Sequence, residues 1–330
     1  MHKTTRLASM LGIAMAAAIS STAPRALHGQ DKPIASDVKR YLQQLIDGLR
    51  QYRVARDEID WKQLESKTMA AAQGAQTIPD AFPAIRVALT EIRDPWAMYH
   101  AATGQNVGPD APRCAPSRTT APTVPSNVGY IKIVPTPARG VRGERETALA
   151  TRTALKQGDD AGVEHWIVDL RGHFMGSLPA PVMGLAPLMG DGTAFKMKFA
   201  EVVTPYNTNQ SSIKSDGQEM QFDLGKFALK HKKPRVAVLV DNGTAGVGEL
   251  LVVAFEGKSD ARVFGTPTCG IPPLRLVPQP LKDGAQFTLS AMLAVDRNDK
   301  VYRGPIEPHE RIDDEPKLFE RAIAWLTTGN

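Results

Sequence analysis

The chain has 330 residues, of which 42% are hydrophobic and 23% are charged, in the proportions of an ordinary folded protein. This composition excludes a chain that is disordered throughout, and the length allows one large domain or two smaller ones. The formal charge is +5, but three positive charges, on Lys3, Arg6 and Arg25, precede the first acidic residue. Without them the charge falls to +2, so no nucleic-acid partner is indicated.

Residues 1–30 have the pattern of a secretory signal peptide. Lys3 and Arg6 are followed by an uncharged apolar run over residues 7–20 and then by small residues. The run is too short for a permanent membrane anchor, and no later stretch is long and apolar enough to cross a bilayer. We therefore expect an exported protein, periplasmic or secreted, without a stable membrane span.

The region that follows, residues 31–104, is predicted to be helical. Its apolar residues recur at steps of three and four, and the helical candidates begin near residues 36, 61 and 79. Five prolines then fall within residues 105–127, which predicts a linker. The remaining residues, 128–330, are expected to form the main domain.

In this main domain, short apolar strands alternate with helical stretches, which is typical of an α/β fold. The predicted strands are residues 128–134, 165–170, 236–240, 261–264 and 286–294. The predicted helices are residues 144–156, a stretch from 179, 246–255 and 315–326. Because several strands are almost wholly apolar, both faces of their sheet should be covered.

Three loops that follow predicted strands are rich in glycine and polar residues: residues 169–176, 241–249 and 265–272. In parallel sheets, binding and catalytic groups gather where the strands end at their carboxyl side. Glycines in such loops let backbone N–H groups approach a ligand. We therefore expect the three loops to meet at one cleft.

In their order and spacing, these loops and their neighbours resemble the tail-specific (C-terminal-processing) serine peptidases. The matching segments are Gly129-Tyr130-Ile131, Asp169-Leu170-Arg171-Gly172, Gly243-Thr244-Ala245, Gly265-Thr266-Pro267-Thr268, the strand from Asp283 to Leu289, and residues 304–308. The resemblance covers residues 128–312 and implies a crotonase-like (Clp-protease-like) β-β-α spiral core. The interval before Gly129 is too short for the PDZ domain of many family members, so we expect none.

The resemblance also implies that the catalytic residues of the family are replaced. Aligned residue by residue, the nucleophilic serine falls on Gly246 and the lysine base on Ile271. Some relatives use an upstream histidine instead, and its position holds Trp96. Glycine has no side chain to attack a carbonyl and isoleucine accepts no proton, so the chemistry of the family is expected to be lost.

The loop that would bind an oxyanion or a ligand carboxylate is assigned to Gly172, Met175, Gly176 and Val247, with Met175 where the family has a glycine. Glu249 persists at the start of the predicted helix, where a carboxylate suits the helix dipole. No coenzyme, phosphate or metal-ligand pattern is present, so neither a cofactor nor a metal is expected.

Three functions remain open at this point. An inactive protein could bind a polypeptide strand and its C-terminal carboxylate in the retained cleft. A hydrolase could instead work through substitute residues, with Cys269 as the nucleophile and His173 or His100 as the base. An enzyme acting on a small acyl substrate is the third. Cys269 could equally be bonded to Cys114, because sequence separation does not distinguish a disulfide from two free thiols.

Overall fold

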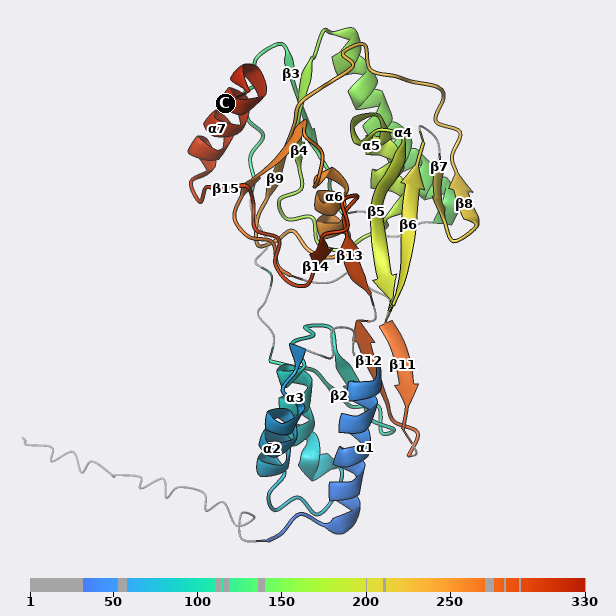
Figure 1. Cartoon of the computed structure of the whole chain (residues 1–330), viewed down its shortest axis with the longest axis vertical. Coiled ribbons are helices and arrows are strands. Elements are labelled where there is room, and N and C mark those ends of the chain that lie inside the picture. Colours follow the sequence, from blue (N-terminus) through green and yellow to red (C-terminus); the bar gives the residue numbers. More distant parts are fainter. Residues whose placement is uncertain are drawn as a thin grey trace, which may run out of the picture.

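The computed structural model describes residues 32–52, 58–110, 114, 119–135, 140–199, 201–209, 212–270, 276–281, 283–290 and 292–329. The predicted signal peptide and the base position Ile271 lie outside these residues. The described chain forms a smaller lobe and a larger lobe, stacked along the long axis of the molecule (Figure 1). Among the helices that the structure describes, none has the length and apolar character needed to span a membrane.

The smaller lobe packs helices against a four-stranded antiparallel sheet with the order β11-β12-β1-β2. Its helices are α1 (Ser36–Tyr52), α2 (Trp61–Ala71), the 3-10 helix η2 (Pro79–Ala81) and α3 (Phe82–Glu91). Its strands are β1 (Met98–His100), β2 (Asn106–Val107), β11 (Leu276–Pro280) and β12 (Gln286–Ser290). The apolar stripe of α1, which includes Leu42, Leu45 and Leu49, is fully buried in the core of this lobe.

One predicted strand, residues 286–294, is two strands that belong to different lobes. β12 pairs with β1, so that Phe287 lies opposite Tyr99, whereas β13 (Leu293–Val295) pairs with β5 (Gly192–Phe199) in the larger lobe. Phe287 and Leu289 are buried in the core of the smaller lobe. A boundary at residue 128 therefore does not separate the two packing units, because residues 276–290 complete the sheet of the N-terminal part.

The larger lobe is built on a five-stranded parallel sheet with the order β15-β10-β9-β4-β3. Its strands are β3 (Val128–Lys132), β4 (His165–Asp169), β9 (Val236–Val240), β10 (Ala261–Gly265) and β15 (Glu310–Arg311). Its helices are α4 (Gly140–Asp160), α5 (Pro179–Met189), α6 (Val247–Phe255) and α7 (Glu315–Thr328). α7 packs on one face through Trp325 and Leu326, and α4, α5 and α6 contribute to the core on the other face, as predicted.

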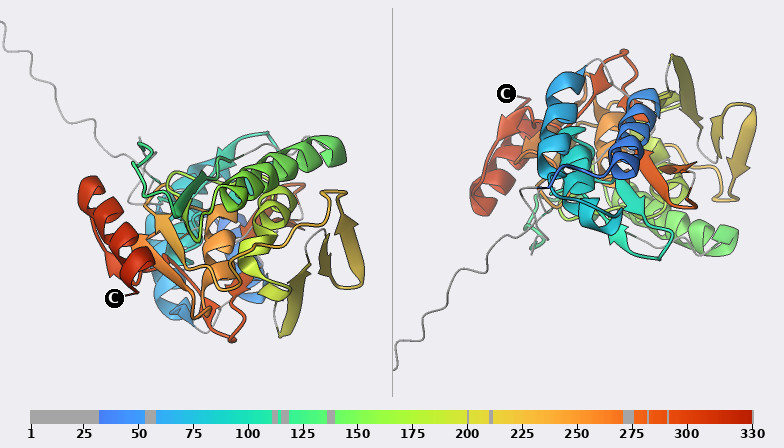
Figure 2. Two further views of the ribbon diagram at one scale, coloured as in Figure 1. Left: turned by 90° about the horizontal axis from the view of Figure 1, so that it is seen from above. Right: turned by 90° about the horizontal axis from the view of Figure 1, so that it is seen from below.

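A second sheet of the larger lobe was not predicted. It has six strands in the order β14-β13-β5-β6-β7-β8, and β6 (Val202–Thr208), β7 (Ser212–Ser215), β8 (Gln218–Gln221) and β14 (Val301–Tyr302) complete it. The hairpin of β7 and β8 stands on the opposite side of the lobe from α7 (Figure 2). β8 is exposed along its whole length, so its sequence carries no apolar alternation. The α/β architecture with an N-terminal helical region is otherwise as expected.

Candidate functional site

The three predicted loops lie side by side where β4, β9 and β10, neighbours in the parallel sheet, come to an end. The N–H of Met175 donates to the carbonyl of Ala245 at 3.1 Å, and the N–H of Ala245 donates to the carbonyl of His173 at 3.0 Å. The N–H of Cys269 donates to the carbonyl of Thr244, also at 3.0 Å. These bonds join the first loop to the second and the second to the third, which confirms the predicted convergence.

Trp96, the residue at the position of the upstream histidine, lies at the same place. It packs with Ala245 and Cys269, and its ring lies 5.9 Å from the ring of Phe174. Its Nε1–H is buried and has no acceptor among the residues that the structure describes. Trp96 thus lies near the second and third loops, but an indole nitrogen donates a hydrogen bond and cannot accept a proton.

Gly246 forms the turn between β9 and α6, a strand-to-helix turn like the one that carries the nucleophile in many hydrolases. Its φ of 60° and ψ of −110° suit glycine better than other residues. A Cβ atom built at Gly246 would lie 2.7 Å from Sδ of Met175. The thioether of Met175 thus occupies the space into which a serine side chain at position 246 would project.

Met175 is itself unusual, because its φ of 61° lies in the left-handed region that non-glycine residues seldom adopt. The resemblance implies a glycine at this position and a serine at 246, whereas the chain has a side chain at 175 and none at 246. These two residues lie against each other and share one space. The sequence predicted that their loops meet, but not that the Met175 side chain fills the space beside Gly246.

Of the four predicted binding-loop residues, two have N–H groups that are already engaged. The N–H of Met175 donates to Ala245, and the N–H of Gly172 donates to Oδ1 of Asp241 at 2.9 Å. The N–H groups of Gly176 and Val247 have no acceptor in the described part of the chain. Gly176 is exposed and Val247 is half-buried at the N-terminus of α6, so these two are the donors left for a ligand.

The two candidate bases are not positioned to activate a nucleophile. His173 is buried, its Nδ1 lies 2.8 Å from the carbonyl of Ile133, and burial lowers its pKa below the ordinary value. A carbonyl only accepts, so Nδ1 carries the proton, and Nε2 has no hydrogen-bond partner within the described residues. His100 lies on β1 of the smaller lobe, where its Nδ1 is 2.8 Å from Oδ1 of Asn106.

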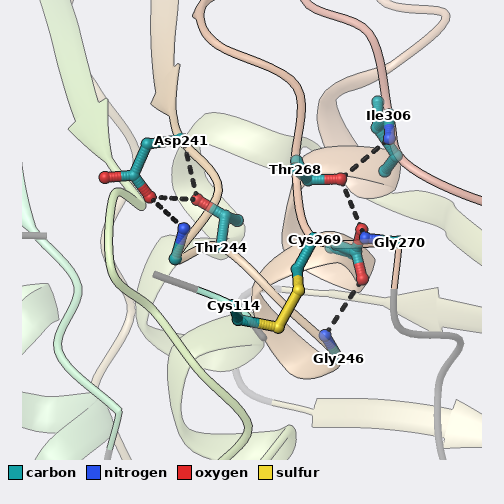
Figure 3. The surroundings of a disulfide bond; sticks show 10 residues. Cys114, Asp241, Thr244, Gly246, Thr268, Cys269, Gly270 and Ile306 are labelled. Carbon is teal, nitrogen blue, oxygen red and sulfur yellow. Dashed lines mark hydrogen bonds between the residues drawn. A yellow bond between two sulfur atoms is a disulfide. The ribbon is translucent and has the colours of Figure 1, made fainter. Parts of the chain in front are cut away.

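Cys269 is bonded to Cys114, so the structure contains a disulfide where the sequence left two possibilities open (Figure 3). Their Cα atoms are 5.4 Å apart, within the usual range for a disulfide. A sulfur in a disulfide is no thiolate, so Cys269 in this state cannot serve as the substitute nucleophile. The nearby hydroxyl of Thr244 is buried and donates to the carbonyl of Leu170 at 2.9 Å.

Glu249 fastens the second loop to the third. Its buried carboxylate accepts the N–H of Gly246 at 3.1 Å, the N–H of Gly270 at 2.8 Å, and the hydroxyl of Thr268. Thr268 in turn accepts the N–H of Ile306 at 2.8 Å (Figure 3). The sequence indicated only a favourable charge at a helix start, whereas the structure shows a carboxylate with three donors.

Asp241 and Asp169 fasten the first loop in the same way. Oδ1 of Asp241 accepts the N–H groups of Gly172 at 2.9 Å and of Gly243 at 2.8 Å. Asp169 is completely buried, and its carboxylate accepts hydrogen bonds from Nε of Arg171 at 3.0 Å and from Nη2 at 2.7 Å. Burial alone would raise the pKa of Asp169, but Arg171, Lys132 and Tyr130 outweigh it and hold the pKa below its ordinary value.

The arrangement therefore holds the three loops firmly together through buried carboxylates and backbone hydrogen bonds. Around the turn, the described residues offer the backbone donors of Gly176 and Val247 and apolar side chains. No group of three or more His, Cys, Asp or Glu side chains in the described part of the chain is placed to hold a metal ion.

The chain is similar to several known proteins. A nisin-resistance protein from Lactococcus lactis subsp. lactis is 32% identical over 162 residues, 48% of this chain and 49% of that protein, so the match spans about half of its length. A lipoprotein from Streptococcus agalactiae has the same fold at 14% identity, with 89% of this chain and 97% of that one covered and a TM-score of 0.54. A photosystem II D1 C-terminal processing protease has it at 14% identity, with 89% and 98% covered and a TM-score of 0.50. The model of peptidase family S41 matches residues 127–312, and the chain belongs to this family.

Proposed function

We propose that this protein is an exported, non-catalytic member of peptidase family S41 that binds polypeptide where the three loops meet, a place that we call the cleft. The observation that carries the proposal is the pair formed by Gly246 and Met175. The nucleophile position has no side chain, and Sδ of Met175 lies 2.7 Å from where the Cβ of such a side chain would be. The site is therefore filled rather than merely deprived of one group.

Amide hydrolysis needs an attacking group, a base and donors for the oxyanion. Gly246 cannot supply the first, and Cys269, the substitute, is engaged in a disulfide. His173 makes no hydrogen bond to a hydroxyl or thiol within the described residues. Met175, at a position that the family uses for the oxyanion, donates its N–H to Ala245. Each requirement thus fails for its own structural reason.

Several features at the same place support binding without reaction. The N–H groups of Gly176 and Val247 have no acceptors in the described part of the chain, so they can donate hydrogen bonds to a peptide carbonyl or carboxylate. Phe174, beside Trp96, is 41% exposed, which is unusual for a large apolar side chain. Together they offer donors and an apolar contact to an extended polypeptide.

The disulfide supports the export part of the proposal. Disulfides persist in oxidising compartments and are rare in the cytosol. The charged and then apolar order of residues 1–30 is that of a signal peptide, and one protein with the same fold is a lipoprotein. N-terminal sequencing of protein recovered from outside the cytoplasm should find a chain that begins near residue 31. An intact Met1 would contradict this.

Inactivity is tested with a serine-reactive fluorophosphonate probe and a panel of unfolded polypeptides. We expect no labelling and no cleavage above background, because loss of a catalytic nucleophile or base typically lowers turnover by about 10⁶. Gly246→Ser alone should not restore activity, because Ile271 replaces the base and Met175 occupies the space. The triple variant Gly246→Ser, Ile271→Lys, Met175→Gly removes all three obstacles and is the form in which a trace of labelling is expected. Robust cleavage by the natural protein would overturn the proposal.

Binding is tested with a fluorescein-labelled unstructured peptide that has a free C-terminus, and with nisin, which the name of the relative suggests as a ligand. Val247→Pro removes the N–H donor while suiting the first position of α6, whereas Val247→Ala keeps the donor. The proline variant should weaken binding about tenfold, and the alanine variant should bind like the natural protein. If neither ligand binds, or if both variants bind equally, the cleft is not the binding site.

A further inference from the structure

We infer that an arginine-lined pocket between the two lobes binds a carboxylate, and that this pocket is the anion-recognising part of the proposed polypeptide site. The pocket has a volume of about 370 Å³. Its walls come from the end of α3 and the residues after it, from Cys269 and Gly270, and from residues 303–305. The choice of ligand rests on the proposed function. The residues of the pocket lie outside the three loops of the candidate site, except for one wall that the third loop provides.

That shared wall belongs to the third loop of the site. Cys269 and Gly270 line the pocket, and both are residues of this loop. The N–H of Gly270 donates to Glu249, whose other oxygen accepts the N–H of Gly246. A polypeptide that lies over Gly246 can therefore reach the pocket by passing along one loop.

Two arginines give the pocket its charge. Arg93 is exposed and has no ion pair with any residue that the structure describes. Arg303 lies 2.8 Å from Glu58, but the two side chains are 42% and 53% exposed, and such surface pairs exchange readily with other partners. Both guanidinium groups are therefore free, or easily freed, to bind an anion.

The two acidic residues of the pocket leave the charge of Arg93 without an ionic partner among the described residues. Asp94 is buried, and its oxygens accept the N–H and hydroxyl of Ser290 and the N–H of Trp96. Asp110 is 76% exposed and lies 3.6 Å from Arg86, a cation outside the pocket. Asp94 is thus satisfied internally, whereas Asp110 stands in an exposed pair of the same kind as that of Arg303, so these two charges offset each other. The charge that remains for a ligand is that of Arg93, which forms no ion pair with the described residues.

The backbone at Arg93 also points to a use for its side chain. Arg93 follows the end of α3 with a φ of 52°, and its N–H donates to the carbonyl of Thr90 at 3.0 Å. Glycine is the usual residue at such a helix end because it adopts this conformation without strain. An arginine held there at a conformational cost indicates that the guanidinium contributes something that the turn itself does not require.

The shape of the pocket narrows the class of ligand. Pro95, Pro109 and Pro305 give it rigid apolar walls beside the arginines. Its volume lies at the lower end of about 300–1,000 Å³ for ligand pockets, which suits one or two residues rather than a long segment. The group recognised is therefore a carboxylate with an apolar neighbour. Its source is either the C-terminus of a polypeptide or an Asp or Glu side chain.

The test uses isothermal titration of the mature protein with three small probes. The first probe, N-acetylphenylalanine, carries a terminal carboxylate. The second, N-acetylphenylalanine amide, has no carboxylate. The third, N-acetylaspartate with its main-chain carboxyl group converted to an amide, carries only the side-chain carboxylate. We expect at least one acid to bind about tenfold more tightly than the phenylalanine amide. The acid that binds more tightly identifies the source of the carboxylate. Equal affinity for all three probes would overturn the inference.

The variants separate the side chain of Arg93 from its backbone. Glycine suits the φ of 52°, so Arg93→Gly should keep or raise the thermal midpoint of unfolding. The same variant should lower the affinity for the acid probe about tenfold. Arg303→Gln should also lower the affinity for the acid probe, and Arg93→Lys should keep part of that affinity. The control is Arg142→Gln, which changes an exposed arginine of α4 outside the pocket. Unchanged affinity in Arg93→Gly, or an equal loss in the control, would refute the site.

The outcomes for the pocket and for the cleft can be told apart. If polypeptide binding depends on the N–H of Val247 but not on Arg93, the proposed function stands and the pocket inference fails. If the acid probe binds through Arg93 while no polypeptide binds, the pocket stands as a site for small carboxylates and the polypeptide function fails.

Discussion

The buried side and the cleft side of the three loops differ in how far they depart from the pattern of the family. On the buried side, Asp169, Arg171 and Glu249 keep their types and make dense hydrogen bonds. On the cleft side, the resemblance implies that Gly246 and Met175 stand at positions that would touch a substrate. The side chains that hold the loop backbones in place therefore differ from those that would face a ligand. The two groups can change independently of each other.

The largest expected effect concerns the disulfide, which joins residues 155 positions apart. The variant Cys114→Ser, Cys269→Ser should lose about 3–5 kcal/mol of unfolding free energy, since a long closed loop restricts the unfolded chain strongly. Urea unfolding measures this, and reduced natural protein should show the same loss. If the double variant kept its stability but lost a hydrolytic activity, Cys269 would be a reacting residue rather than a structural one.

The second expected effect concerns the buried carboxylate of Glu249. Glu249→Gln places an amide group among three donors and should cost about 2–4 kcal/mol, because at least one buried N–H or hydroxyl loses its acceptor. Glu320→Gln is the matched control, since Glu320 is exposed on α7. Equal unfolding curves for the two variants would show that the Glu249 carboxylate is not what stabilises the loops.

A third expected effect concerns the fit between Gly246 and Met175. Gly246→Ala should cost about 1–2 kcal/mol through its positive φ and its contact with Sδ. Adding Met175→Gly should recover on the order of 1 kcal/mol as a coupling energy. Gly225→Ala is the control, because Gly225 has a φ of +71° and no atom lies within 4 Å of the place its Cβ would take, so only the backbone cost remains. A coupling near zero would mean that the two replacements are independent.

The smallest expected effect is a pH dependence centred on Asp169. Its folded pKa is held below the unfolded value of about 3.9, so the ionised group contributes stability above that pH, which is lost as the pH falls through the folded pKa. Tyr130→Phe removes a 2.8 Å hydrogen bond to Oδ2 of Asp169 and should cost about 1 kcal/mol at neutral pH and less in acid. Tyr206→Phe is the matched control, since its ring stacks on Phe195. A loss that is independent of pH would contradict the assignment.

Much of the fold follows from local patterns in the sequence. The spacing of Leu42, Leu45 and Leu49 is sufficient to indicate α1, and the apolar runs indicate β4 and β9. The sheet from β5 to β8 could not be predicted in this way, because strands such as β8 face solvent on both sides and have no apolar period. The splitting of residues 286–294 between lobes depends on tertiary packing that no local pattern records.

The candidate site was predictable in its place but not in its contacts. The order of the loops indicated that Gly246 and Met175 would be near one another, and the resemblance implied that Trp96 would be nearby. That Met175 fills the space at Gly246 depends on the direction of a side chain far away in the sequence. Likewise, the bond between Cys114 and Cys269 depends on a distance that sequence separation does not give. From the sequence, Glu249 was predicted only to place a favourable charge at a helix start. Two of its hydrogen-bond donors come from the third loop, which meets it only in the folded chain.

Because β11 and β12 close the sheet of the smaller lobe, neither lobe is encoded by one continuous stretch of the chain. A fragment that ends near residue 110 would leave Tyr99 without Phe287 opposite it. During synthesis from the N-terminus, the smaller lobe cannot complete its sheet until residue 290 has emerged from the ribosome. Lobes exchanged between relatives as gene cassettes would therefore have to carry residues 276–290 together with the N-terminal segment, or the recipient would present an unpaired strand edge to solvent.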